Sequence, residues 1–369
     1  MQATDRALLP LTWLIGASLM ATPPQEVPAA PKVAVKRPNA ATLYLAAADG
    51  LPRALGVDSV YDVRLPEPLA EDPRARRYEE ASWDDLVTKV ANELGLFAQA
   101  AHTTECTFGQ EGDDGLLACD MMISPLFSLA QLTAAHGWGC SREGTFEASL
   151  HDASTLLAFS RQFGAQSSSS AMAIGSQVEL NGLALLRGVF EVGAPLAEPT
   201  HRKAAAMLEE HARARPGRRT AAVGVRAEVK RILQHAASKA PATAAEREAP
   251  VDDVQRVLRE SLDAVAAQVD ARLERWLTPL TASDDVPLAE LIAQVEANMT
   301  AARAQVKGLK VEALKKDRTR EQVLDYVADI LVTLLLRSPQ EVVQNDAYSR
   351  EEIAACRKLV ADVKRAAGK

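Results

Sequence analysis

Apolar residues recur three and four positions apart along most of the chain, which is the spacing of amphipathic helices. The longest stripe runs from Val251 to Trp276, and shorter ones predict helices over 39–50, 147–163, about 170–192 and 200–215. No alternating run is long enough for a sheet. The pattern therefore predicts an all-α fold of helical hairpins or a bundle, with long amphipathic helices in the C-terminal half.

Capping residues place several helix ends. Ser124 followed by Pro125 predicts a helix start, and Gly137 and Gly139 predict its end. In the last part of the chain, Ser338 with Glu341 and Ser349 with Glu352 form two capping boxes, so two successive helices are expected there.

A change of composition divides the chain. Residues 236–250 are polar, alanine-rich and interrupted by proline, which is typical of a linker between domains. We expect one α-helical domain over 41–240 and an α-helical bundle over 251–369.

The N-terminal residues have the composition of a targeting segment. Residues 7–21 are mostly apolar but shorter than the roughly 20 residues of a membrane span, and residues 22–40 are rich in proline and alanine. We predict a signal peptide over 1–21, a linker over 22–40, and an exported protein of the periplasm or cell envelope without a transmembrane helix after signal removal. The alternative is a cytoplasmic protein whose first helix packs on the body.

The net charge and the absence of known motifs exclude several classes of ligand from the expected function. The net charge of −7 gives no global reason to expect nucleic acid. Phosphate-binding loops, dinucleotide fingerprints and zinc-protease signatures do not occur in the sequence, so no cofactor and no metal site are expected.

Two pairs of residues are candidates for cysteine chemistry. Cys106 and Cys119 flank a glycine-rich segment and would form a disulfide if the chain is exported; the alternative is two buried thiols. Cys140 follows the predicted helix end at Gly137 and Gly139. In the nucleophilic interpretation it lies near a helix N-terminus, where the pKa of a thiol can be lowered, and His136 accepts its proton. A glycine-rich turn between two helices explains the same residues, and the sequence identifies no third group to orient the histidine. Cys356 is predicted to be a buried core thiol.

A basic cluster consists of Arg213, Arg215, Arg218 and Arg219, within a segment (201–240) that holds 10 Lys and Arg against 3 Asp and Glu. It could bind an anionic partner. The alternative is that these charges complement the C-terminal end of a helix, whose dipole favours cations.

Three stretches over about 40–195 carry a family resemblance. The family pattern has three successive helices after an opening segment, which corresponds to residues 39–44 here. Residues that fit its second helix are Gly144, Ala148, Leu156, Leu157 and Phe159, and residues that fit its third helix are Ile174, Gln177, Glu179 and Leu183. With these, the chain resembles exported α-helical proteins of planctomycete-type bacteria, although it departs from their pattern at 160–162. The resemblance implies helical hairpins packed like tetratricopeptide repeats and implies no activity. No 34-residue repeat period occurs in the sequence.

These observations favour a protein-interaction or scaffolding module without catalytic chemistry, whose partner is an unknown protein or anionic polymer. The alternative is a helical hydrolase or lyase with a groove between the two halves that uses His136 and Cys140.

Overall fold

The computed structural model describes residues 39–59, 62–66, 78, 81–108, 115–166, 169–191, 196–220, 222–227, 262–312 and 339–367. The protein is all-α, as predicted. Its helices are α2 (Ala40–Leu55), α3 (Ala81–Lys89), α4 (Ala91–Ala101), α5 (Gly115–Arg142), α6 (Phe146–Gly164), α7 (Ser169–Glu191), α8 (Glu198–Ala214), α12 (Leu262–Thr281), α13 (Leu288–Glu312) and α15 (Pro339–Ala367). The expected signal peptide and most of the linker after it lie outside the described residues.

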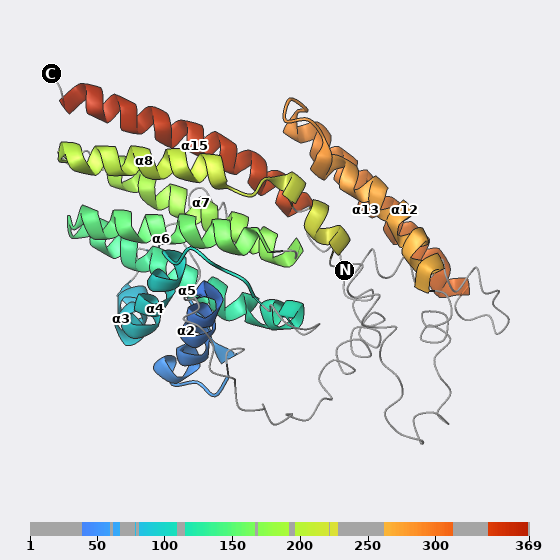
Figure 1. The fold of residues 1–369 in the computed structure, drawn as a ribbon, viewed down its shortest axis with the longest axis horizontal. Coiled ribbons are helices and arrows are strands. Elements are labelled where there is room, and N and C mark those ends of the chain that lie inside the picture. Colours follow the sequence, from blue (N-terminus) through green and yellow to red (C-terminus); the bar gives the residue numbers. More distant parts are fainter. Residues whose placement is uncertain are drawn as a thin grey trace, which may run out of the picture. The chain divides into compact units, whose positions relative to one another are not determined.

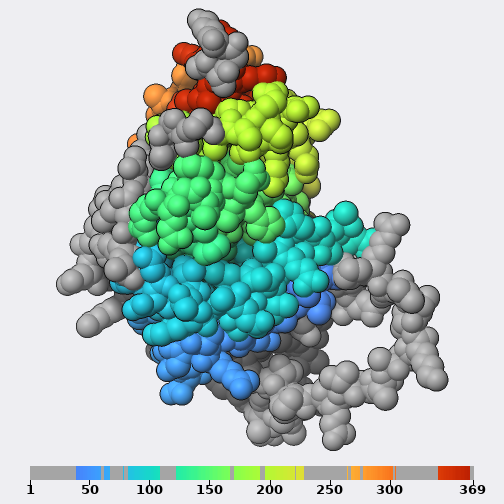
Figure 2. All heavy atoms as spheres, turned by 90° about the vertical axis from the view of Figure 1, so that its left-hand side faces the viewer, coloured from blue at the N-terminus to red at the C-terminus, as the bar shows by residue number. Residues whose placement is uncertain are grey.

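The core forms around α6 and α7, which share the most extensive helix contact of the described chain. Helix α5 packs against both of them, and α8 and α15 lie side by side on the other side of α7 (Figure 1). In space-filling view the described segments follow one another in layers in the order of the sequence (Figure 2). Each helix therefore covers the apolar face of helices close to it in the chain, with α15 as the exception.

Helix α15 returns from the end of the chain to the core of the first half. It packs on α7, and Ile353, Cys356 and Val360 belong to the same hydrophobic cluster as the residues of α2 to α8. Cys356 is buried, as predicted. The expected linker at 236–250 lies outside the described residues, so the division itself stays a prediction. The described helices nevertheless show that the last helix of the expected second domain shares the core of the first.

Three of the predicted helix boundaries are wrong. Helix α5 begins at Gly115 rather than near Ser124 and continues through Gly137 and Gly139 to Arg142. It includes Pro125, and its packing on α6 and α7 supports the helix there, since tertiary packing contributes most of the stability of helices in proteins. Helix α15 is continuous through Ser349, because no glycine or proline stops it before that serine and packing on the core buries the side chain.

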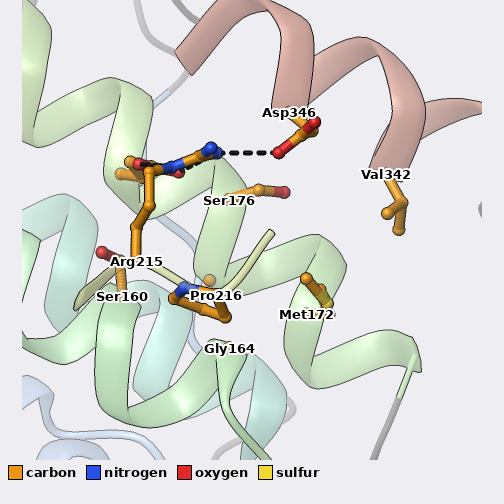
Figure 3. A pocket seen from close by; sticks show the side chains of 10 residues that line it. Ser160, Gly164, Met172, Ser176, Arg215, Pro216, Val342 and Asp346 are labelled. Carbon is orange, nitrogen blue, oxygen red and sulfur yellow. Dashed lines mark hydrogen bonds and ion pairs between the residues drawn. The ribbon is translucent and has the colours of Figure 1, made fainter. Parts of the chain in front are cut away.

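A buried charged network joins α7, α8 and α15. The Glu179 carboxylate accepts hydrogen bonds from His211 Nε2 at 2.6 Å and from Arg215 Nε at 2.8 Å. Arg215 also pairs with Asp346 at 3.0 Å (Figure 3). On the other side of the imidazole, Arg161 Nη1 lies 3.3 Å from His211 Nδ1. The pocket beside Arg215 has a volume of about 10 Å³, near the minimum for one water molecule. We call Glu179, His211, Arg215 and Asp346 the α7–α8–α15 network.

In the described part of the chain, no helix combines the length and the apolar character that crossing a membrane requires.

Candidate functional site

The C-terminal end of α5 approaches α6 and α7 very closely, and a glycine makes this possible. A Cβ atom at Gly137 would lie 2.3 Å from Leu185 Cδ2 and 3.2 Å from Asp152 Cβ. A larger residue would push the helices apart. Gly137 therefore brings its neighbour His136 within reach of the Asp152 carboxylate on α6.

A tight turn joins α5 to α6 and fixes their relative position. Gly144 has a φ of 77°, in the left-handed region that glycine adopts without strain, as is common after a helix end. The Thr145 amide and hydroxyl both donate to the Cys140 carbonyl oxygen, at 2.8 and 2.9 Å. The turn thus holds the backbone of Cys140 while its side chain remains on the outer face of α5.

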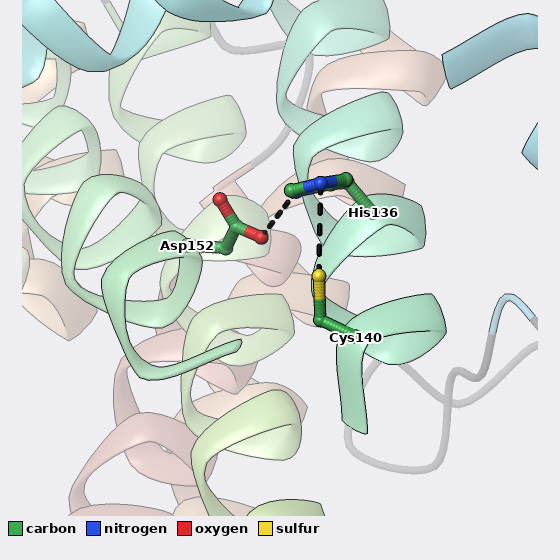
Figure 4. Close-up of side chains that lie close together, drawn as sticks. All are labelled: His136, Cys140 and Asp152. Carbon is green, nitrogen blue, oxygen red and sulfur yellow. Dashed lines mark hydrogen bonds and ion pairs between the residues drawn. The ribbon is translucent and has the colours of Figure 1, made fainter. Parts of the chain in front are cut away.

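Three side chains meet at this point, and we call them the α5–α6 cluster. His136 Nδ1 lies 2.7 Å from Asp152 Oδ2, and Cys140 Sγ lies 3.6 Å from His136 Nε2 (Figure 4). Asp152 is buried, Cys140 is half-buried, and the His136 side chain is 45% exposed. Because the carboxylate accepts the Nδ1 hydrogen, the lone pair of Nε2 faces the sulfur and the solvent.

The pKa of each of the three groups is raised, by a hydrogen bond at His136 and mainly by burial at Asp152 and Cys140. The hydrogen bond to Asp152 is the main cause that raises the pKa of His136, and Glu143 adds to it. Burial raises the pKa of the Asp152 carboxyl, against the opposing effect of His136. Burial also raises the pKa of the Cys140 thiol, and the negative charges of Asp152 and Glu143 raise it further. Burial and nearby negative charge therefore disfavour a free Cys140 thiolate in the cluster.

This geometry matches two kinds of chemistry. The order of cysteine, histidine and aspartate is that of a nucleophile, a base and the group that orients the base. A zinc ion bonded tetrahedrally to sulfur at about 2.3 Å and to nitrogen at about 2.0 Å would hold those atoms about 3.5 Å apart. The observed separation of 3.6 Å is equally suited to a metal held by Cys140 and His136. In the described part of the chain, no other group of three potential ligands comes together.

The sequence identified His136 and Cys140 but not Asp152. The two predicted residues are one turn apart on α5, whereas the aspartate reaches them from α6 through the turn at Gly144. The pair lies on α5, which packs against α3, α6 and α7. The groove between the two halves, which the hydrolase or lyase alternative requires, stays a prediction. Elsewhere, His102 stacks on His151 of α6, with ring centroids 5.2 Å apart.

The predicted disulfide is not tested. Cys106 is a free, half-buried cysteine, and burial raises the pKa of its thiol to about 12. The side chain of Cys119 lies outside the described residues.

The predicted basic cluster does not form one exposed surface. Arg215 belongs to the α7–α8–α15 network, and the Arg218 side chain is buried and donates to the carbonyl oxygens of Ala282 and Ser283, at 2.8 and 2.6 Å. Arg213 and Arg219 are exposed. Arg215 and Arg218 follow the end of α8 and have their partners on α7, on α15 and in the segment before α13. Only Arg213 and Arg219 of the four are exposed, so the binding of an anionic partner stays a prediction for these two.

Comparison of the chain with protein-family models, with curated proteins and with solved structures finds no match.

Proposed function

We propose that this protein binds a divalent transition metal of the zinc type at the α5–α6 cluster, through Cys140 Sγ and His136 Nε2. The observation that carries the proposal is the 3.6 Å separation of these two atoms on a histidine whose other nitrogen is held by a buried carboxylate. Histidine ligands of metals are oriented in this way, by an outer carboxylate that fixes the tautomer and increases the basicity of the ligating nitrogen.

The electrostatics of the cluster support a cation rather than a reactive thiolate. Cys140 lies in the last turn of α5, where the partial negative charge of the helix end favours cations. Asp152 and Glu143 add negative charge nearby. A bound dication would compensate these charges and deprotonate the thiol.

Cobalt(II) titration of the full chain tests the proposal, because cobalt takes the place of zinc and reports its ligands by absorption. We expect a thiolate-to-cobalt charge-transfer band in the near ultraviolet that disappears in Cys140→Ser and is displaced by zinc. Cys106→Ser is the matched control and should keep the band. A wild-type spectrum without the band at saturating cobalt would contradict the proposal.

Nucleophilic thiol chemistry, in a helical hydrolase or lyase, is the second candidate. The order of the three side chains favours it, whereas the raised pKa of Cys140, caused mainly by burial, weakens it. A nucleophilic Cys140 would react with iodoacetamide faster than free cysteine at neutral pH.

The interaction or scaffolding role expected from the sequence also stays a proposal. Three other predictions keep the same standing: export, tetratricopeptide-like packing of the hairpins, and the resemblance to planctomycete-type proteins. The all-α architecture supports it. An anionic partner would meet Arg213 and Arg219, and replacing both by Gln should then remove partners from a low-salt pull-down. An unchanged set of captured partners would contradict the anionic interaction.

A further inference from the structure

A cavity of about 220 Å³ lies between α8 and α15, which pack side by side (Figure 1). Its middle is lined by Ala205 and Leu208 of α8 and by Val360 and Ala361 of α15, and we call it the α8–α15 cavity. An apolar cavity of about 150 Å³ is large enough for benzene. The α8–α15 cavity therefore has room for a hydrocarbon group of that size and one polar group.

The ion pairs between the two helices show which residues share an end of the cavity. Lys364 Nζ lies 3.6 Å from Glu198, and Arg357 Nη2 lies 2.8 Å from Glu209. The beginning of α8 thus lies beside the last part of α15, and the two helices run antiparallel. The cavity therefore has a Glu198 end and a Glu209 end, which different turns of the helices form.

At the Glu198 end, two cations are available to a ligand. Arg202 and Lys364 line the cavity there, and each lies 3.6 Å from the Glu198 carboxylate, which is longer than a hydrogen bond. Together they carry one positive charge more than Glu198 compensates. At the other end, Arg357 donates a hydrogen bond to Glu209 at 2.8 Å, and the two charges balance. The Glu198 end is therefore suited to one additional negative charge.

The same end contains a buried histidine with an unpaired nitrogen. His201 precedes Arg202 and lines the cavity, and its side chain is 2% exposed. Among the described residues, its Nε2 atom has no hydrogen-bond partner, and the Phe190 ring against it, with centroids 5.6 Å apart, supplies none. A buried polar atom without a partner costs free energy, and an acceptor placed beside it would recover this cost.

We propose that the α8–α15 cavity binds a small monocarboxylic acid. The hydrocarbon part lies on the apolar middle of the cavity, and the carboxylate accepts hydrogen bonds from Arg202, Lys364 and His201 at the Glu198 end. The single excess positive charge there matches one carboxylate better than a doubly charged phosphate. This site shares no residue with the α5–α6 cluster, so it is independent of the proposed metal binding.

Isothermal titration of the full chain with hexanoate tests the proposal, and hexanamide is the uncharged comparison. We expect saturable binding of hexanoate and weaker binding of hexanamide. The double variant Arg202→Gln, Lys364→Gln should weaken hexanoate binding at least about tenfold, because it removes two charged donors. The matched control is Lys358→Gln, Arg365→Gln, which makes the same change of charge at exposed positions of α15 outside the cavity and should leave the affinity unchanged.

His201→Phe tests the buried donor. It keeps an aromatic ring against Phe190 and removes the unpaired nitrogen, so the fold should be retained while hexanoate binds more weakly.

Each result supports or overturns the inference. A chain that does not bind hexanoate, or that binds hexanamide equally well, has no carboxylate site in this cavity. Equal hexanoate affinities of the two double variants would likewise overturn the assignment of the Glu198 end. A folded His201→Phe variant with wild-type affinity would show that this histidine is not a donor.

Discussion

Two clusters of this protein combine a histidine with a buried carboxylate, and their partners make them opposite in character. In the α7–α8–α15 network, Glu179 is bonded by both His211 and Arg215, and each of these side chains is at most 10% exposed. In the α5–α6 cluster, the partner of Asp152 is a single half-exposed histidine, and the third member is a neutral thiol. Each carboxylate of the network pairs with an arginine, and Asp346 pairs with Arg350 as well, whereas the ion-pair partner of Asp152 is His136.

The pKa of each carboxylate expresses this difference. Burial alone would raise the pKa of Glu179, but Arg215 and the hydrogen bond from His211 outweigh it and hold the pKa at about 2. Burial prevails at Asp152 and raises its pKa, because His136 alone does not compensate. We therefore expect changes in the network to act mainly on stability and, under the proposed function, changes in the cluster to act mainly on metal binding.

The largest expected effect comes from removing the cation of the network. Arg215→Met keeps much of the side-chain volume but leaves Glu179 and Asp346 buried without their arginine. We expect the free energy of unfolding to fall by about 3–5 kcal/mol, the usual cost of breaking a buried ion pair from one side. Urea denaturation measures this fall.

The matched control for this variant is Arg213→Met, on the exposed side of the same helix, which should stay within about 0.5 kcal/mol of wild type. Equal stabilities of the two variants would show that the network does not stabilise the fold.

The second largest effect is expected from acid, which should reduce the stability that the α7–α8–α15 network contributes. The pKa of Glu179 is lowered from 4.5 to about 2 in the folded chain, so its contribution is complete above pH 4.5 and is lost as the pH falls toward 2. The difference corresponds to about 3 kcal/mol of stability. Unfolding free energies measured between these pH values should show this fall, and Glu179→Gln should show a flatter dependence. A variant as acid-sensitive as wild type would contradict the assignment.

In the α5–α6 cluster, a substitution should affect binding rather than stability. Asp152→Asn removes the charge that orients His136, and we expect cobalt affinity to fall about 10- to 100-fold. The free energy of unfolding should change little, because burial already disfavours this charge. Asp85→Asn, at an exposed position of α3, is the control for affinity. A cobalt affinity unaffected by Asp152→Asn would show that the carboxylate does not support a ligand.

The sequence predicts the helices of this fold better than their ends or their charged partners. Apolar spacing located α6, α7 and α8, although α6 and α7 are buried over most of their circumference rather than on one face. It could not show that Ser349 lies inside a helix, since the packing of α15 on α7 decides that. Local signals describe what a segment can do alone, and α15 is held by residues far away in the chain.

The same limit applies to the two clusters. His136 and Cys140 were identified as a histidine close to a cysteine beside two glycines. The expected helix N-terminus at Cys140 is wrong, because α5 continues to Arg142 and carries both residues near its C-terminal end. Asp152 was missed because the turn at Gly144 and the close approach at Gly137 bring it there, and neither feature predicts a particular partner. Arg215 was predicted on the surface because its neighbours in the chain are charged, while its carboxylate partners come from α7 and α15.

The smallest expected effect concerns the reactivity of Cys140, and its sign distinguishes the two candidate functions. Because burial and then Asp152 raise the pKa of the thiol, wild-type Cys140 should react with iodoacetamide a few times more slowly than free cysteine at neutral pH. Asp152→Asn removes a negative charge next to the sulfur and should speed the reaction modestly. In a nucleophilic triad the same substitution would misorient the histidine and slow the reaction.

Mass spectrometry of the Cys140 peptide over time measures both rates, and zinc should protect the wild-type thiol. A Cys140 that reacts faster than free cysteine and slows in Asp152→Asn would reverse our preference and make the α5–α6 cluster a nucleophile.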